Sequence, residues 1–115
     1  VKDEMITKNL PFVNKNGTMK EVVLKMTESR LGLALIGNEE KLEGIITDGD
    51  LRRSLLMSDD FTKIEIKDIL NKSPMTAYEN DNLQVAHERM KEARLQSLVV
   101  KNNDEKIVGV IQIFK

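Results

Sequence analysis

A chain of 115 residues is long enough for one compact domain, and a hydrophobic content of 40% can supply its core. Aromatic residues make up only 3%, so that core must be aliphatic, and a net charge of −1 gives no electrostatic argument for nucleic acid or an anionic membrane as a general partner. The sequence contains no cysteine, no apolar run of membrane-spanning length and no signal-peptide pattern, which excludes disulfides and thiolate metal sites and favours a cytoplasmic protein.

The first elements expected along the chain are helices. Val1 opens a helix-like pattern. Further on, Thr18 and Glu21 have the spacing of a capping box, in which a hydroxyl and a carboxylate satisfy the free amides of a helix start. The residues that follow at helical spacing predict one apolar face, formed by Met19, Val22, Val23 and Met26.

A hairpin and a second helix are expected next. The apolar run 33–36 predicts a buried strand, the segment 37–41 is typical of a turn, and residues 42–47 predict the paired strand. Residues 50–57 then predict a helix with one apolar face, carried by Leu51, Leu55 and Leu56.

The second part of the chain shows the same order of elements. The polar stretch 58–65 is expected to be a linker, and residues 66–70 predict a short helix. Pro74 favours an extended segment leading to residues 77–78, and Asn82 is the expected cap of another helix. That helix carries Leu83, Val85, Ala86 and Met90, and a hairpin of residues 98–100 and 107–111 follows it.

Three short segments recur in the same order, which identifies an internal repeat. Met26–Leu31 and Met90–Leu95 share four of six residues, Gly44–Ile46 matches Gly109–Ile111, and Val1–Asp3 matches Ile66–Asp68. We therefore expect an α/β (α+β) fold of two related units, residues 1–57 and 66–115, each with a small three-stranded sheet and flanking helices. One unit is too short to bury a core alone, so the two should pack face to face with pseudo-twofold symmetry and share an interior.

The two ends of the sequence suggest a fragment of a longer protein. The chain opens on Val1 rather than Met and closes directly after a strand-like run. On this interpretation the C-terminal helix of the second unit is absent.

The segment Gly44–Arg53, with the sequence GIITDGDLRR, resembles the signature of CBS motifs, a Gly–apolar–x–Thr–x–x–Asp run at the end of the third strand. The repeated order of elements resembles a CBS motif pair, also called a Bateman module. The same string, together with residues 10–16 and 31–34, resembles the CBS region of bacterial arabinose 5-phosphate isomerases, which supply Kdo synthesis for lipopolysaccharide or capsule.

In those isomerases a separate sugar-isomerase (SIS) domain precedes the CBS pair, and nothing in this sequence resembles it. The resemblance therefore implies a non-catalytic regulatory piece of an enzyme, with the SIS domain of its own chain and a second copy, through the CBS helices, as partners. It implies a nucleotide or nucleotide-sugar ligand, either CMP-Kdo or an adenine nucleotide, and no required cofactor. The alternatives are a ligand-free oligomerisation scaffold and, more distantly, an enzymatic role for the fragment itself.

The resemblance assigns ligand contacts to Thr47 and Asp50. A hydroxyl beside the amides of a helix N-terminus suits a phosphate, and a carboxylate three residues on suits a ribose diol. The competing structural interpretation is that Asp50 caps the helix and that Thr47 satisfies an amide at the end of the strand.

Further candidates surround this pair. Arg52 and Arg53 can add charge-assisted contacts to a phosphate or a sugar acid. The apolar wall is expected from Phe12, Val13, Leu33 and Ile46. In the second unit Gln112 replaces Thr47 and Lys115 falls at the position of Asp50, so the first unit should hold the intact site and the second should mostly supply a wall.

Other constellations are weak. Residues 48–50 resemble the start of a calcium loop, but the remaining ligands of such a loop are missing. His87 is the only histidine, which excludes a histidine cluster for a metal, and it is expected at the surface or at a subunit contact. No catalytic motif and no metal site are predicted.

Overall fold

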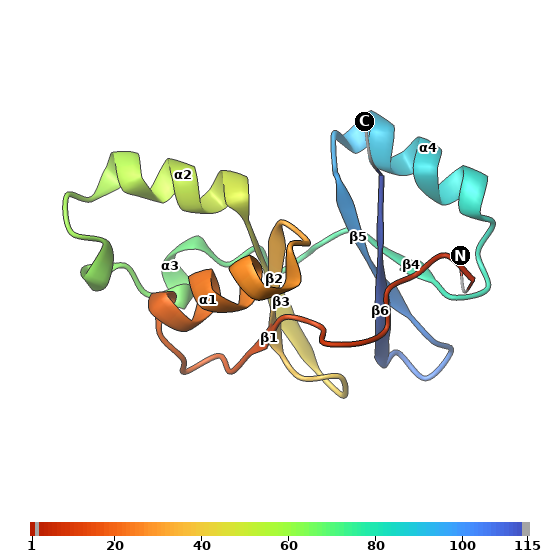
Figure 1. The fold of residues 1–115 in the computed structure, drawn as a ribbon, viewed down its shortest axis with the longest axis horizontal. Helices are drawn as coiled ribbons and strands as arrows, with labels where there is room; N and C mark the ends of the chain where they lie inside the picture. The colour runs from red at the N-terminus through yellow and green to blue at the C-terminus, as the bar shows by residue number, and fades with distance from the viewer. Residues whose placement is uncertain (2, 114–115) are drawn as a thin grey trace.

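A computed structural model describes Val1 and residues 3–113 (Figure 1). The first unit contains β1 (Phe12–Val13), α1 (Met19–Ser29), β2 (Leu33–Gly37), β3 (Leu42–Thr47) and α2 (Asp48–Met57). A 3₁₀ turn, η1 (Phe61–Lys63), and the short helix α3 (Ile66–Ile69) lead to the second unit. That unit contains β4 (Thr76–Tyr78), α4 (Leu83–Ala93), β5 (Ser97–Lys101) and β6 (Ile107–Gln112).

The strands form two three-stranded sheets with the same topology, in the orders β1-β2-β3 and β4-β5-β6. In each sheet the first pair of strands is parallel and the second pair is an antiparallel hairpin. The registers also correspond, since Val13 pairs with Ile36 as Ala77 pairs with Val100. The predicted fold class is confirmed: two small sheets with helices on their outer faces.

The core has three layers along the long axis of the molecule. The outer layer of the first unit lies between its sheet and α1 and α3, and that of the second unit lies between its sheet and α4 (Figure 1). The middle layer joins the two sheets through seven buried residues, Leu31, Leu33, Leu35, Ile45, Val99, Ile107 and Val110. The two units therefore share one aliphatic interior, as expected from the repeat.

Each unit sends its first segment to the sheet of the other unit. Ile6 exchanges backbone hydrogen bonds with Val110, and Asn71 exchanges them with Ile45. These contacts explain the repeated glycine of the signature. A Cβ at Gly44 would collide with the Asn71 carbonyl oxygen and the Leu70 side chain. Gly109 has the same role in the second sheet, where it leaves room for the backbone of the segment that contains Ile6.

The helix caps lie at the residues that the sequence predicts. Thr18 accepts from the Glu21 amide at 3.2 Å, which is the first half of the predicted capping box, and Asn82 accepts from the amides of α4. Both α1 and α4 end on an arginine in the left-handed region, with φ of 59° at Arg30 and 58° at Arg94. The repeat therefore preserves the turn that leads from each helix into the next strand.

Several expectations were wrong in detail. Val23, Leu55, Leu56 and Val85 are exposed. Leu55 and Leu56 are exposed because α1 and α3 already cover the first sheet and α2 extends away from it (Figure 1). The opening residues form turns and one isolated bridge instead of a helix, since Ile6 pairs with the second sheet. The segment 58–65 is not purely polar, because Ile64 and Phe61 pack on the outer core of the first unit.

Within the described residues, no helix is both long enough and apolar enough to cross a membrane.

Candidate functional site

A cleft of about 490 Å³ separates the beginning of α2 from the end of α4. Figure 1 shows these two helix ends facing one another above the paired sheets. The first unit contributes Gly32 and the turn from Thr47 to Gly49, and the second unit contributes residues 93–97. A volume of several hundred Å³ is typical of sites for small ligands.

Thr47 lines this cleft, and it is bonded to Asp50, which is not itself one of the lining residues. The Thr47 amide and hydroxyl both donate to Asp50 Oδ2, at 2.9 and 3.0 Å, and the Asp50 amide donates back to Thr47 Oγ1 at 3.3 Å. Helix α2 begins at Asp48, so Thr47 is the N-cap and Asp50 is the third helical residue of a capping box. The competing interpretation assigned the cap to Asp50; the structure gives it to Thr47, with Asp50 as its reciprocal partner.

The other carboxylate oxygen of Asp50 is held by an arginine. Arg53 Nη2 donates to Asp50 Oδ1 at 2.7 Å, one turn further along α2. The Arg53 guanidinium lies over Gly49, where an added Cβ would stand 3.2 Å from its Nη1. In this arrangement Arg53 lines the cleft, and the Asp50 carboxylate is turned toward Thr47 and Arg53.

The cleft concentrates positive charge on a chain whose net charge is −1. Arg52 and Arg53 line it from the first unit and Arg94 from the second, against a single lining carboxylate, that of Asp48. The N-terminus of α2 adds the positive end of the helix dipole. Arginines that line one cleft from two elements suit a phosphate or carboxylate with more than one acceptor oxygen.

One of the four residues expected in the apolar wall lines the cleft. Leu33 lines the cleft, together with Leu31 and Ile45. Ile46 is fully buried on the opposite face of the sheet, because successive side chains of a strand alternate between its faces.

The other two predicted wall residues also lie elsewhere, for a related reason. Val13 packs in the outer layer, against α1, and Phe12 packs against the layer between the sheets. Both belong to β1, which pairs with β2 and is thereby separated from β3, the strand that leads into the site.

The second unit contributes more than an apolar wall, which the sequence interpretation missed. Arg94, Gln96 and Ser97 are polar residues of the cleft lining. The Ser97 hydroxyl donates to the Leu31 carbonyl oxygen at 2.6 Å and so connects the two units directly below the cleft. The repeated Met-x-Glu-x-Arg-Leu segment was the available signal, because it placed an arginine at the end of both helices.

The second copy of the signature has lost its polar pair, as predicted for the part that is described. Gln112 stands in place of Thr47 and donates to the Arg30 carbonyl oxygen at 3.3 Å. Backbone symmetry persists, since the Asp48 amide donates to Gly32 as the Ile113 amide donates to Gln96. Lys115, the counterpart of Asp50, lies outside the described residues.

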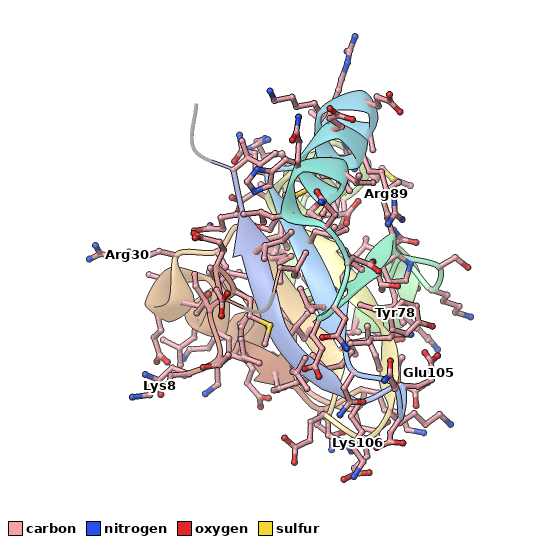
Figure 2. All side chains as sticks on the ribbon, turned by 90° about the vertical axis from the view of Figure 1, so that its right-hand side faces the viewer. Lys8, Arg30, Tyr78, Arg89, Glu105 and Lys106 are labelled. Atoms are coloured by element: carbon pink, nitrogen blue, oxygen red, sulfur yellow. The ribbon has the colours of Figure 1, made fainter. Side chains whose placement is uncertain are left out.

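Titratable groups with shifted pKa values lie away from this cleft. Tyr78 donates to Glu105 at 2.6 Å at the edge of the second sheet (Figure 2). This hydrogen bond and the Glu105 charge raise the Tyr78 pKa, and the same bond, with the Lys101 ammonium, lowers the Glu105 pKa. His87 is half-buried on α4, and within residues 1 and 3–113 no three His, Asp or Glu side chains are grouped as metal ligands.

The fold and the signature define the class of protein. The family model of the CBS domain matches residues 1–57 and again residues 66–113, and the chain belongs to the CBS domain family as a tandem pair. A solved CBS domain protein from Pyrobaculum aerophilum, complexed with AMP, shares the fold with a TM-score of 0.83 at 24% identity, over 96% of this chain and 86% of that one.

The relatives in sequence include arabinose 5-phosphate isomerases. The chain is 37% identical, over 97% of its length, to a probable arabinose 5-phosphate isomerase of Haemophilus influenzae. It is 30% identical, over 96% of its length, to the arabinose 5-phosphate isomerase KpsF of Escherichia coli. The chain spans 33% and 34% of those two proteins, about a third of each. The resemblance drawn from residues 44–53 is thereby confirmed.

Proposed function

We propose that this chain is the regulatory, nucleotide-binding part of a cytoplasmic arabinose 5-phosphate isomerase whose catalytic domain lies outside these 115 residues. The observation that carries the proposal is the cleft lined by Thr47, Arg52, Arg53 and Arg94, with Asp50 bonded to Thr47. The similarity to isomerases over the whole chain supports the parent enzyme, and the AMP complex of the Pyrobaculum protein supports the ligand class.

The ligand would lie across both units. Its phosphate would face the three arginines, its sugar hydroxyls would approach Asp50, and its base would contact the apolar floor of Leu31 and Ile45. Such a ligand favours the arrangement of the units that it contacts best, and it regulates the attached enzyme to the extent that this arrangement differs between active and inactive states.

Two ligand types fit this chemistry. An adenine nucleotide is suggested by the AMP complex. CMP-Kdo, suggested by the pathway of the isomerases, carries a phosphodiester and a sugar carboxylate, two anionic groups for the arginines. The relative affinities of AMP, ATP, CMP and CMP-Kdo for the purified chain, measured by titration calorimetry, decide between them.

The binding site is tested with a matched pair of capping-box variants. Asp50→Ala should weaken the tightest ligand of that panel at least about tenfold, by loss of a charged hydrogen-bond acceptor. Asp68→Ala removes the equivalent residue of the α3 capping box, where Asp68 accepts from the Glu65 amide at 3.0 Å, and should leave affinity unchanged. Equal affinities for both variants would refute the site, and no binding of any of the four ligands would refute the sensing role.

A second candidate function is oligomerisation without a ligand. The end of α2 exposes Leu56 and Met57 by 88% and 85%, an apolar surface suited to a second copy of the chain. Sedimentation of the wild type and of Leu56→Glu tests this surface: a dimer converted to a monomer supports it, and an unchanged oligomeric state contradicts it. Isomerase activity of the purified chain alone would contradict both proposals.

A further inference from the structure

The hydrogen bonds of Asp50 leave its carboxylate almost fully occupied. A carboxylate oxygen offers about two acceptor directions. Oδ2 accepts from both the amide and the hydroxyl of Thr47, and Oδ1 accepts from Arg53. One acceptor direction therefore remains, on Oδ1, whereas a sugar diol that donates two hydrogen bonds to a single carboxylate needs two.

Arg53, which occupies one acceptor direction of Asp50 Oδ1, is easier to displace than Thr47. The Thr47 bonds belong to the N-cap of α2, and breaking them would uncap the helix. The Arg53 side chain is 69% exposed, and an exposed ion pair of this type is weak. The guanidinium lies over Gly49, which has no side chain to hold it in place.

We propose that Arg53 is an exchangeable partner that makes recognition of the sugar depend on recognition of the phosphate. This inference rests on the proposed nucleotide site. In the free protein Arg53 occupies Asp50. A bound phosphate replaces the Asp50 carboxylate as the partner of the Arg53 guanidinium, since this planar donor suits either anion. Asp50 is then free to accept hydrogen bonds from both sugar hydroxyls. A nucleoside without a phosphate must displace Arg53 with no compensating contact.

This exchange predicts opposite effects of one substitution on two related probes. Arg53→Met keeps a long unbranched side chain and removes the donors. Adenosine should then bind about two- to fivefold more tightly, because the competing exposed ion pair is gone. AMP should bind about tenfold more weakly, because its phosphate loses a charge-assisted contact.

The matched control is the neighbouring arginine. Arg52 lines the same cleft, and the described structure records no hydrogen bond or ion pair between Arg52 and Asp50. Arg52→Met should therefore weaken AMP without tightening adenosine. Affinities for all three proteins are measured by calorimetry, with amide NMR shifts of Gly49 for weak adenosine binding.

The possible results separate the exchange from the proposed function. Opposite shifts in Arg53→Met, absent in Arg52→Met, support the exchange. Weakened AMP with unchanged or weakened adenosine in both variants overturns it and leaves the nucleotide site standing. Failure of AMP and adenosine to bind any of the three proteins overturns the proposed adenine-nucleotide site and the exchange with it.

Discussion

The two units of this chain have the same backbone and different chemistry at corresponding positions. Where the first unit ends β3 with Thr47 and a capping box, the second ends β6 with Gln112, which bonds to the opposite unit. Where β1 ends at Val13, the second sheet continues past the corresponding Ala77 to Tyr78, which pairs with Lys101. The glycines, the left-handed arginines and the strand registers are shared.

This difference separates the requirements of folding from those of binding. Shared features lie where backbones approach closely or turn, and a substitution there disturbs both units alike. Divergent features lie at the mouth of the cleft or at a sheet edge, where either unit can change without loss of the core. The following predictions test that separation, starting with the largest expected effect.

The repeated glycines should be needed for stability in both units, and more so in the first. Gly44→Ala brings a methyl group against the Asn71 backbone and should lower the free energy of unfolding by about 1–3 kcal/mol. Gly109→Ala should fall at the lower end of that range, because part of its contact is the flexible Met5 side chain. Urea unfolding measures both, and a stable Gly44→Ala would contradict the role of the crossing segment.

The two arginines that end α1 and α4 should differ in binding although their backbones match. Arg94→Ala should weaken AMP about tenfold, or about 1.4 kcal/mol, by loss of a phosphate contact. Arg30→Ala removes the same residue type from the same backbone conformation outside this cleft and should have little effect on AMP. The reverse order in calorimetry would place the ligand in the smaller hollow that Arg30 lines.

The corresponding residues at the ends of β3 and β6 should differ in their effect on stability. Thr47→Ala removes the N-cap acceptor of α2 and should cost about 1 kcal/mol. Gln112→Ala removes one long side-chain hydrogen bond and should change the free energy of unfolding by about 0.5 kcal/mol or less. Equal losses in urea unfolding would show that the two ends still carry the same structural role.

The smallest effect concerns the polar contact at the edge of the second sheet. Because the hydrogen bond to Glu105 raises the Tyr78 pKa, its stabilisation is present below the ordinary tyrosine pKa and is lost as pH rises through the raised value. Glu105→Gln should lower the Tyr78 pKa toward its ordinary value, while Asp104→Asn, in the same turn, should not. Tyr78 is the only tyrosine, so ultraviolet titration reports it directly, and an unchanged pKa in Glu105→Gln would contradict the assigned cause.

The sequence predicted the elements well because their signals are local. Thr18 and Asn82 capped the helices that they were expected to cap, and both hairpins formed from the expected runs. The apolar face predicted for α2 is buried only at Leu51, because helical spacing identifies a face but not what covers it. Leu55 and Leu56 do not pack on the first sheet, because α1 and α3 already cover its outer face.

Several residues that line the cleft were expected from the sequence. Thr47, Arg52, Arg53 and Leu33 belong to the cleft or its edge, and they come from one continuous signature or from the strand beside it. Ile46 was assigned to the wrong face of its strand, because an apolar run in a doubly buried strand gives no alternation from which to choose.

By itself the sequence determined that this chain is a duplicated α/β unit with one intact signature. Helix caps, strand runs and repeats are patterns of residues that lie close together in the sequence. Only the tertiary structure decided that Arg94 joins Arg53 in one cleft and that Asp50 is already held by Thr47 and Arg53. The first of these depends on two sheets packing through a shared core, and the second on side-chain geometry at one helix end. Residue spacing along the chain constrains neither.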